Sequence, residues 1–504
     1  MIGMIRDPKT DLDITNRSWP NGELQFLASD NALWEYHDLY HYTELIENLL
    51  NPYTFSDRKP AALLMESSDE LVMAIASLWL LKIQFFPLSP AMTDSELTRA
   101  YGRLDISVLI TDRKNRKRAG SIPSHPAPAL KKRKAKRSSK ITEGSWAGDE
   151  DRVFGFFQTS GTTGEPAIVP LIRRQMLAAT EGSARNFRPL PNRYWLHCLP
   201  FNHIGGIAVI LRSLLHHSAI YRMDRFEPDW ASRFLSENPL FQTASLVPTM
   251  LKRLLEIPGF QVHKKFEALL VGGGPISQSL IGEALERGIP LVTSYGMTET
   301  CAQISANPML QPSGVYHPRR SVGTIFSPNR VQIRDRNGRS LKANMAGTIW
   351  LKGPQLFGGY LEAEKNRGKF DKDGWFNTGD LGYLNTFGQL FIQNRRNDII
   401  ITGGENVDPS EIEHLLENME GVVEAAVVGV EDEEWGQKVV AFLVGNGTNP
   451  GSKELRSMLG RSLSHFKIPK EWVWLPKLPR TRTGKVKRNR LRELYLESGT
   501  GKSD

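Results

Sequence analysis

Residues 159–164 read TSGTTG and combine hydroxyl groups with glycines in a short run. The run follows the apolar segment VFGFF at 153–157, which is typical of a strand, and it precedes Pro166. A strand that ends in this way leaves backbone N–H groups without ladder partners, and the glycines permit dihedrals that curl these groups around an anion. Phosphate is the natural ligand of such a loop. For this run alone a plain Gly/Thr turn remains the alternative, and the spacing of a Walker A loop is absent.

Five further segments carry residues suited to a nucleotide. The run GGGP at 272–275 follows an apolar stretch, so its backbone can approach a flat ligand closely. The run SYGMTET at 294–300 brings an aromatic ring, hydroxyls and a carboxylate together. Asp380 lies in a Gly-bounded turn, where its carboxylate can accept ribose hydroxyls, and Arg395 and Lys485 are cations that can reach phosphate. Each segment alone has an interpretation as a turn, a cap or a solvated charge, but together they favour a nucleotide site.

In this order the segments resemble the motifs of the acyl-adenylate-forming enzymes, a superfamily of acyl-CoA synthetases, peptide-synthetase adenylation domains and luciferases. The resemblance extends from about residue 60 to about residue 490. Within the superfamily it is greatest to the 2-succinylbenzoate–CoA ligases of menaquinone and phylloquinone biosynthesis, on the words LPFNHIGGIAVILRSLL, SLVPTMLKRLL, LLVGGGP, SYGMTETCAQIS and RRNDIIITGGENVDPSEIE. Other aryl- and medium-chain acyl-CoA ligases share most of these words, so the acid stays open at this point.

The resemblance implies an ATP-dependent acid–CoA ligase. A carboxylate attacks the α-phosphorus of ATP to give an acyl adenylate and pyrophosphate, and the CoA thiol then displaces AMP. The first step brings two anions together, so it needs preorganised positive charge and Mg²⁺ more than a protein nucleophile. The resemblance gives Lys485 the bridge between carboxylate and α-phosphate, Thr298 a contact with the α-phosphate and Glu299 the Mg²⁺ ion. It places His203, in PFNHIGG, beside the acyl pocket, although a lone His after a strand is more often structural.

The resemblance also implies which residues contact ATP and CoA. The β- and γ-phosphates are assigned to Thr159, Ser160, Gly161, Thr162, Thr163 and Gly164. The adenine is assigned to Gly272, Gly273 and Gly274, with Tyr295 stacked on it, and the ribose to Asp380 and Arg395. Gly296 is assigned to the same cofactor-binding site. Gly403 and Gly404 are assigned to a tunnel for the pantetheine arm of CoA, because they have no side chain to obstruct a thiol. The C-terminal unit is expected to rotate between the two half-reactions about a hinge at Asn397.

Two positions depart from the simple pattern. Arg212 lies nine residues after His203 and could face the second carboxylate of a dicarboxylic substrate, although a solvent-facing or salt-bridged Arg is the commoner arrangement. Ala167 stands where the family's phosphate loop usually carries Lys. The missing ammonium predicts a weaker hold on the pyrophosphate oxygens and a raised KM for ATP rather than an inactive enzyme.

The segments are positioned by an α/β fold. Short apolar runs alternate with helical spacing from residue 60 to about 300, which predicts parallel sheets covered by helices. From about 320 to 394 short strands and turn signals predict a small barrel-like subdomain. We expect an N-terminal AMP-binding domain over residues 1–396 and a small mobile α+β domain over 397–504. Residues 1–55 are expected either to cover the acyl site or to extend the first domain.

Composition narrows the class of protein. The net charge is +9, but residues 113–140 hold twelve Lys and Arg and no acid, and the remainder carries a net charge of −3. A flexible, solvated basic insertion at about 113–145 explains this best, with an electrostatic contact to nucleic acid, anionic lipid or an acidic partner as the alternative. Two cysteines and no apparent signal peptide predict a cytoplasmic protein without disulfides or a zinc site. A homodimer is compatible with these features. A stand-alone adenylation domain is a further alternative.

Overall fold

The computed structural model describes residues 24–498 apart from short gaps. The gaps are residues 31, 57, 132–148, 160–165, 187, 275, 277, 308–320, 396–399, 403–404, 408, 433–434, 462, 464 and 482–483, and for residues 394, 395, 401, 405, 406 and 436 only the backbone is described. Within this part of the chain, none of the helices is long and apolar enough to cross a membrane.

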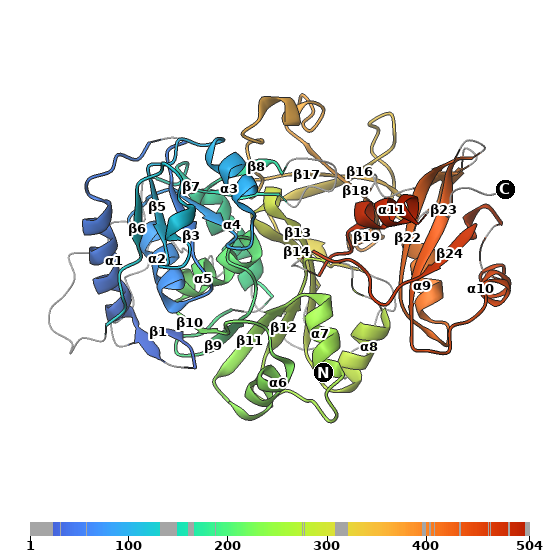
Figure 1. The fold of residues 1–504 in the computed structure, drawn as a ribbon, viewed down its shortest axis with the longest axis horizontal. Helices are drawn as coiled ribbons and strands as arrows, with labels where there is room; N and C mark the ends of the chain where they lie inside the picture. The colour runs from blue at the N-terminus through green and yellow to red at the C-terminus, as the bar shows by residue number, and fades with distance from the viewer. Residues whose placement is uncertain are drawn as a thin grey trace.

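Two mainly parallel sheets form most of the N-terminal domain (Figure 1). The first has six strands in the order β6-β5-β3-β4-β7-β8, all parallel except the β7–β8 pair. Its strands are β3 (Ala61–Leu64), β4 (Phe85–Leu88), β5 (Val108–Thr111), β6 (Ser124–Pro126), β7 (Val153–Gln158) and β8 (Ile168–Ile172). The intervening helices are α2 (Asp69–Leu80), α3 (Asp94–Tyr101), the 3₁₀ turn η1 (Arg116–Arg118) and, after β8, α4 (Arg173–Ala184).

The second sheet has nine strands in the order β15-β14-β13-β12-β11-β9-β10-β1-β2. Its strands are β1 (Gln25–Ala28), β2 (Leu33–Glu35), β9 (Tyr194–His197), β10 (Ala219–Arg222), β11 (Phe241–Leu246), β12 (Ala268–Val271), β13 (Leu291–Met297), β14 (Ala302–Ala306) and β15 (Thr324–Ile325). The central strands β13 to β1 are parallel, and β2, β14 and β15 are antiparallel. Its helices are α1 (Tyr36–Leu50), α5 (Ile204–His216), α6 (Pro228–Glu237), α7 (Pro248–Leu255) and α8 (Gln278–Glu286).

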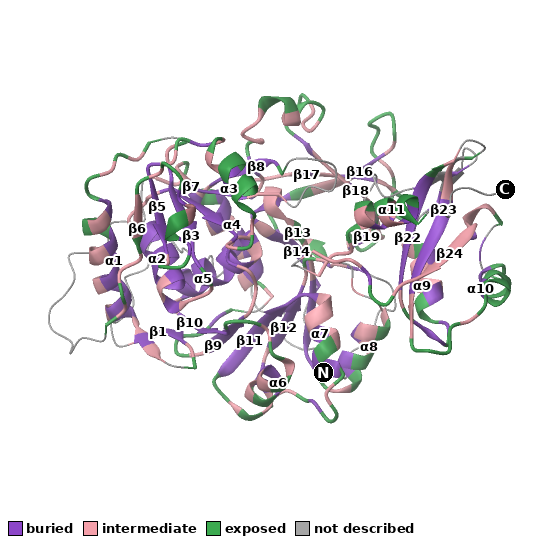
Figure 2. Cartoon of the chain, in the orientation of Figure 1, coloured by how far each residue is buried: buried purple, intermediate pink, exposed green. Residues whose placement is uncertain are grey.

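The main core lies between the two sheets. Helices α2 and α5 contact each other there, and both are buried along nearly their whole length (Figure 2). A helix that is apolar all round fits such a position, because both of its faces meet protein. Helix α1 packs on α2, and β1 pairs with β10. Residues 25–50 are therefore part of the N-terminal domain, and whether the segment also covers the acyl site stays open.

The remaining strands form smaller sheets. β16 (Arg330–Arg334), β17 (Gly347–Lys352), β18 (Phe376–Leu384) and β19 (Leu390–Arg395) make a four-stranded antiparallel sheet where a barrel-like subdomain was expected. The C-terminal domain has β20 (Ile400–Thr402) paired with β21 (Glu405–Val407), and β22 (Val422–Asp432), β23 (Gly436–Gly445) and β24 (Glu471–Trp474) in one sheet. Its helices are α9 (Pro409–Glu417), α10 (Ser452–Leu459) and α11 (Arg488–Glu497).

The C-terminal domain has cores of its own. Helices α9 and α10 contribute to one apolar cluster with the sheet, and α11 contributes to a second one. The predicted fold class, a large parallel-sheet domain followed by a small α+β domain, is confirmed. The predicted boundary at Asn397 lies outside the described residues and stays a prediction.

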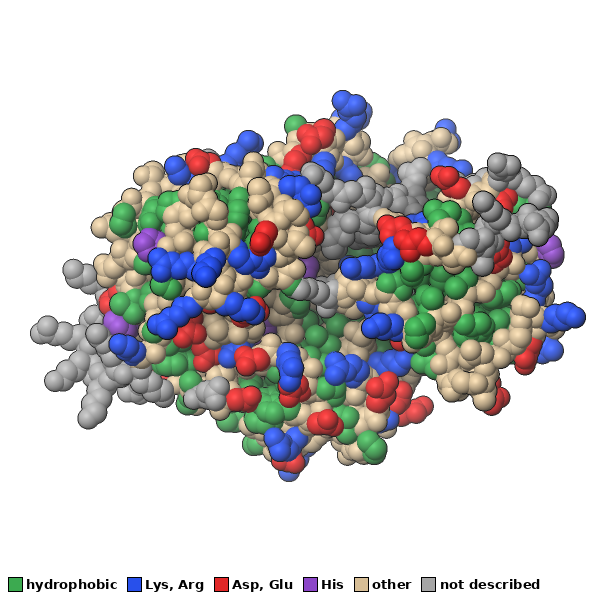
Figure 3. Space-filling model, in the orientation of Figure 1, with side chains coloured by type: hydrophobic (Ala, Val, Ile, Leu, Met, Phe, Trp, Pro, Cys, Tyr) green, Lys and Arg blue, Asp and Glu red, His purple; other side chains and the backbone are tan. Residues whose placement is uncertain are grey.

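The basic insertion is only partly a loop. Residues 113–131 are described, and they contain η1 and the edge strand β6, which pairs with β5. His125 of β6 accepts or donates a 2.6 Å hydrogen bond with the Tyr53 hydroxyl. The expectation of a flexible loop is therefore wrong for this half, because sheet pairing fixes it, whereas residues 132–148 lie outside the described part. Lys and Arg side chains gather on this lobe of the surface (Figure 3).

Candidate active site

The two stems of the Gly/Thr loop are the ends of the antiparallel pair β7 and β8. The Thr159 amide donates to the Ala167 carbonyl at 2.9 Å, and the Ala167 amide donates to Thr159 Oγ1 at 3.0 Å. These two bonds close the base of the loop. Ser160, Gly161, Thr162, Thr163 and Gly164 lie outside the described residues, so their phosphate contacts stay predictions. Ala167, which follows the loop, is only 7% exposed.

The glycine run follows β12 at the carboxyl edge of the parallel sheet, and the next strand in the sheet, β13, leads into Ser294 and Tyr295. Gly273 has φ +79°, which a residue with a side chain rarely adopts. A Cβ at Gly272 would lie 2.8 Å from Ser294 Oγ. The run therefore presents bare backbone beside β13, at the edge of an open α/β sheet where ligands commonly bind.

Tyr295 and Asp380 meet although they are 85 residues apart. The Tyr295 hydroxyl donates to Asp380 Oδ2 at 2.6 Å, and Asp380 is 4% exposed. Asp380 is paired with Arg395 in the register of β18 and β19, so these two backbone positions are neighbours, but the Arg395 side chain is outside the described part. Position 296 also requires glycine for a structural reason, because a Cβ there would lie 2.0 Å from the Ala302 carbonyl oxygen.

Thr298 and Glu299 lie in the 3₁₀ turn η2 (Thr298–Thr300), which joins β13 to β14. Glu299 Oε1 accepts a 2.6 Å hydrogen bond from the Tyr360 hydroxyl. The turn is followed by Cys301 and Ala302 at φ +51° and +74°. Two consecutive non-glycine residues in this region are strained, and such strain is concentrated at functional sites.

The residues around Glu299 fit Mg²⁺. This ion prefers oxygen ligands and is usually held by one or two carboxylates together with substrate phosphates, rather than by an all-protein cage. The described residues contain no group of three or more His, Cys, Asp or Glu that could hold a metal by themselves. A single carboxylate on an ordered turn, with substrate phosphates as further ligands, matches the requirement.

Lys485 lies at the junction of the two domains. It closes a turn in which the Thr481 amide donates to its carbonyl at 2.7 Å and its own amide donates to Thr481 Oγ1 at 3.1 Å. Gly484 is at φ +79°, and a Cβ there would lie 2.6 Å from Thr249 Oγ1 at the start of α7. This turn of the C-terminal domain therefore touches the N-terminal domain, as the dark red segment in Figure 1 shows.

His203 lies just before α5 and close to Lys485. Burial lowers the pKa of His203, and the charge of Lys485 lowers it further. Both effects disfavour the imidazolium, so His203 is neutral at neutral pH. The predicted acyl-pocket histidine and the predicted catalytic lysine are thus near enough for the charge of one to act on the pKa of the other.

Arg212 is a buried cation on α5. It is 3% exposed, and its Nε and Nη2 atoms have no hydrogen-bond partner among the described residues. Burial lowers the pKa of Arg212 to about 10, and the nearby Cys301 opposes this shift. Cys301 follows Glu299 by two residues. Arg212 is not in solvent, and it forms no salt bridge with the residues that the structure describes.

The two cysteines are free. Cys301 is fully buried, and burial raises the pKa of its thiol well above the ordinary value. Burial raises the pKa of Cys198 to about 12, and its thiol donates to the Ser245 carbonyl at 3.6 Å.

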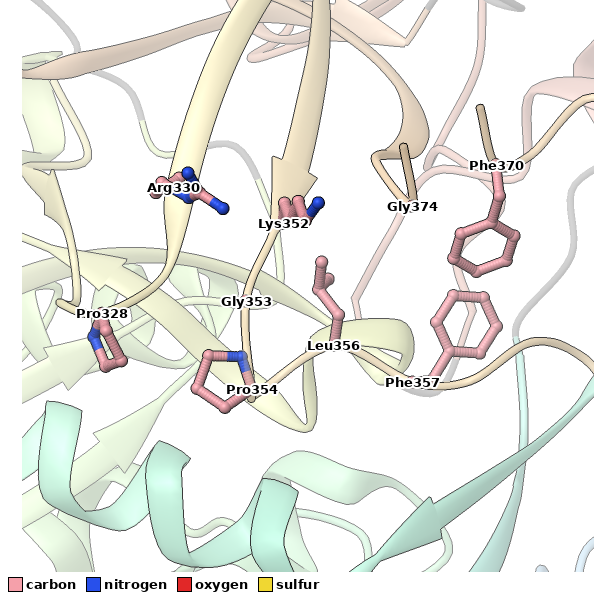
Figure 4. Close-up of a pocket in the computed structure, with 9 residues that line it drawn as sticks. All are labelled: Pro328, Arg330, Lys352, Gly353, Pro354, Leu356, Phe357, Phe370 and Gly374. Atoms are coloured by element: carbon pink, nitrogen blue, oxygen red, sulfur yellow. The ribbon is translucent and has the colours of Figure 1, made fainter. Parts of the chain in front are cut away.

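A cavity of about 330 Å³ lies on the four-stranded sheet (Figure 4). Arg330 and Lys352 flank it, and the rings of Phe357 and Phe370 form one wall. It contains none of the predicted catalytic residues. Phe357 nevertheless connects it to the site, because its amide donates to the Glu299 carbonyl at 2.9 Å.

Sequence reasoning missed Tyr360, Glu362 and Arg103. Each forms contacts with a site segment that is at least 60 residues away in the chain. The word GGYLEAE carried the only signal, a Tyr after two glycines. Gly403 and Gly404 lie outside the described residues, and their role stays a prediction.

Known proteins share this sequence and this fold. The family model described as "AMP-binding enzyme" matches residues 18–361, and "AMP-binding enzyme C-terminal domain" matches residues 411–485. A 2-succinylbenzoate–CoA ligase of Listeria monocytogenes serotype 4b is 38% identical over 347 residues, which are 69% of this chain and 71% of that protein. One of Enterococcus faecalis is 30% identical over 465 residues, which are 91% of this chain and 93% of that protein.

Solved structures agree. The o-succinylbenzoate CoA synthetase (MenE) of Bacillus subtilis with its acyl-adenylate intermediate has a TM-score of 0.83 at 28% identity and covers 93% of this chain and 95% of that one. Its complex with ATP and magnesium ion has a TM-score of 0.81 at 28% identity, with 93% and 97% covered. The family predicted from the motifs is confirmed: the chain belongs to the AMP-binding enzymes.

Proposed function

We propose that the protein is an AMP-forming acid–CoA ligase that converts 2-succinylbenzoate to 2-succinylbenzoyl-CoA in menaquinone or phylloquinone biosynthesis. ATP and CoA are its co-substrates and Mg²⁺ its metal. Membership of the AMP-binding family supports the reaction class. The choice of acid is supported by relatives named 2-succinylbenzoate–CoA ligase, which align with up to 91% of the chain.

The observation that carries the choice of acid is the buried guanidinium of Arg212. A buried, unpaired charge is costly, and a carboxylate is the partner that a guanidinium binds best. Arg212 lies nine residues along α5 from His203, which corresponds to about 13 Å of helix rise. An acid with a second carboxylate would supply the guanidinium with such a partner.

The described residues supply positioning and charge for the first half-reaction. Tyr295 fixes the orientation of the Asp380 carboxylate, which is assigned to the ribose. Tyr360 fixes Glu299, which would hold Mg²⁺, and that ion neutralises phosphate charge when bound. Lys485 brings its ammonium beside neutral His203, where the carboxylate of the acid and the α-phosphate meet. A point charge here stabilises both anions as they approach.

The second half-reaction needs a different arrangement. In the present one the turn that contains Lys485 contacts α7, which is the arrangement suited to adenylation. For thioester formation we propose that the C-terminal domain rotates about Asn397, withdraws Lys485 and brings Gly403 and Gly404 to the acyl side. The small core of this domain is separate from the main core, which allows such a rigid-body movement.

Two alternatives remain within the same family. Another aryl- or medium-chain acid would use the same motifs, but it would leave Arg212 without a partner. A stand-alone adenylation domain would form the adenylate without using CoA. Nucleic-acid binding through the basic insertion has no support among the described residues beyond positive charge. A cytoplasmic location and a homodimer stay predictions.

An acid panel tests the proposal. Purified protein is given ATP, Mg²⁺ and one of 2-succinylbenzoate, benzoate, cinnamate or octanoate, and pyrophosphate and AMP release are measured with and without CoA. We expect 2-succinylbenzoate to give the highest kcat/KM and AMP release to require CoA. Equal rates with a monocarboxylic acid would contradict the choice of acid. Pyrophosphate release that is the same with and without CoA, with the acyl adenylate as the product, would favour the stand-alone adenylation domain.

A further inference from the structure

One short segment, residues 357–362, contacts both the backbone and the side chain of Glu299. The Phe357 amide donates to the Glu299 carbonyl at 2.9 Å, and the Tyr360 hydroxyl donates to Glu299 Oε1 at 2.6 Å. The Tyr360 hydroxyl therefore fixes the carboxylate that would hold Mg²⁺, and Phe357, three positions earlier, fixes the backbone of the same residue.

The other end of this segment contacts the base of the Gly/Thr loop. The Leu361 amide donates to the Ile168 carbonyl at 2.9 Å, and the Ile168 amide donates to Glu362 Oε2 at 3.1 Å. Arg103 donates through Nη1 to the Pro166 carbonyl and pairs through Nη2 with Glu362 Oε1. The Arg103 and Glu362 side chains are 18% and 16% exposed, so the pair is largely shielded from solvent.

The segment itself is held rigidly. Asn366 accepts from the Tyr360 amide at 2.7 Å and donates to the Tyr360 carbonyl at 2.9 Å. Gly359 is at φ +129°, and a Cβ there would lie 2.9 Å from Asn366 Oδ1. The Phe357 ring packs against Phe376 with ring centroids 5.0 Å apart. These contacts hold the two ends of the segment in a fixed relation to each other.

We propose that residues 357–362, together with Arg103, are a positioning element that sets the distance between the magnesium carboxylate and the phosphate loop. This inference rests on the proposed ATP-dependent function. Tyr360 and Glu362 are its two positioning residues, and Arg103 completes the second contact. Position 167 is Ala, so the loop has no ammonium of its own there, and the guanidinium of Arg103 contacts its base at the Pro166 carbonyl. The cation acts on the loop backbone, with its charge balanced by Glu362.

Equilibrium binding of nucleotides tests this without measuring turnover. Dissociation constants for ATP and AMP are measured by calorimetry, in Mg²⁺ and in EDTA. AMP has no β- or γ-phosphate, so a defect confined to the phosphate loop changes ATP affinity and leaves AMP affinity unchanged. We expect Arg103→Ala and Glu362→Ala each to weaken MgATP binding about 10-fold, in keeping with the loss of one charge-assisted contact, with AMP binding altered less than 2-fold.

Tyr360→Phe removes only the hydroxyl and should act through the metal. We expect the ratio of the ATP dissociation constant in EDTA to that in Mg²⁺ to fall about 5-fold, while the dissociation constant in EDTA stays unchanged. The matched control is Glu471→Gln, which breaks the Lys438–Glu471 ion pair of the C-terminal sheet. It should change none of these constants.

A double variant, Arg103→Ala with Glu362→Ala, separates a joint role from two general defects. If the pair acts as one unit, the double variant binds MgATP about as weakly as either single variant. Glu362→Gln keeps an acceptor for the Ile168 amide, so it can be measured even if Glu362→Ala unfolds the domain. It should weaken MgATP binding about 3-fold. The inference is overturned if ATP and AMP affinities fall together, or if all variants match the control. Wild-type protein that does not prefer MgATP over AMP would instead contradict the proposed function.

Discussion

Replacing Arg212 by Met should stabilise the protein and remove its recognition of a dicarboxylic acid. Met has a similar length and is apolar, so it fills the space of the guanidinium stem without a charge. In the free protein Arg212 is buried and its Nε and Nη2 atoms are unpartnered. The substitution therefore removes a cost from the unliganded protein and a contact from the complex.

The structure gives the size of both effects. Burial lowers the pKa of Arg212 to about 10 from 12.5, which corresponds to roughly 3 kcal/mol against the charged form at neutral pH. For an N-terminal domain of roughly 370 residues with an unfolding entropy of about 2.1 cal/mol/K per residue, the variant should melt about 4 °C higher. Loss of one partner of a buried charge pair costs about 2–5 kcal/mol, so kcat/KM for 2-succinylbenzoate should fall roughly 30- to 4000-fold.

The assay compares acids that differ by one carboxylate. CoA-dependent AMP release is measured with 2-succinylbenzoate, 3-benzoylpropanoate and 2-butanoylbenzoate, because each of the latter two lacks one of its carboxylates. The monocarboxylic acid that retains the reacting group should be a poor substrate of the wild type. Its kcat/KM should change less than 3-fold in Arg212→Met.

Arg173 is the matched control. It is also buried, and burial lowers its pKa to about 10, but its Nη1 donates to the Trp79 carbonyl at 2.8 Å and its guanidinium stacks on the Trp79 ring at 4.0 Å. Arg173→Met should lower the melting temperature and leave acid preference unchanged. If Arg212→Met is destabilised in the same way, or loses all acids equally, Arg212 is a structural residue and the reasoning is refuted.

Three further predictions concern the charge and protonation of the site. Ala167→Lys adds an ammonium at the base of the loop and should lower KM for ATP about 3-fold; because Ala167 is 7% exposed, the melting temperature is measured too, and an unchanged KM in a stable variant contradicts the account. Lys485→Gln removes a neighbouring cation and should raise the pKa of His203 in an NMR titration, and an unmoved pKa would place the two groups too far apart to interact. Burial lowers the pKa of His197 to about 4, so on acidification the unfolded chain takes up a proton near pH 6.5, before the folded protein does. The free energy of unfolding should therefore fall by up to roughly 3 kcal/mol between pH 6.5 and 4. Urea titrations should show a weaker pH dependence of this free energy in His197→Gln, and an equal pH dependence in variant and wild type would exclude His197 as its cause.

The parts of the fold predicted from sequence are those whose signal is local. Apolar runs bounded by turn residues gave β3, β4 and β5, which are buried on both faces. No helix was predicted for α5, because its sequence IGGIAVILRSLLH has two glycines in its first turn and its apolar residues are not confined to one face. Its place between two sheets, which explains that composition, depends on long-range packing.

The same distinction holds for the site. Asp380, Tyr295 and Glu299 were found because their motifs are contiguous words. Their hydrogen-bond partners were not predicted: Tyr360 is 61 residues from Glu299, and Arg103 is 259 residues from Glu362. No spacing rule connects such residues, since the topology alone decides which strand ends become neighbours.

The state of the two thiols has a practical consequence for observing the domain rotation. Cys301 is enclosed in the main core, and the Cys198 thiol is held in its neutral, unreactive form. Maleimide dyes attack the thiolate, so the native chain is close to a cysteine-free background. One new cysteine on α10 and one on α6 would accept a donor and an acceptor dye selectively, and energy transfer between them would follow the C-terminal domain through each turnover in single molecules.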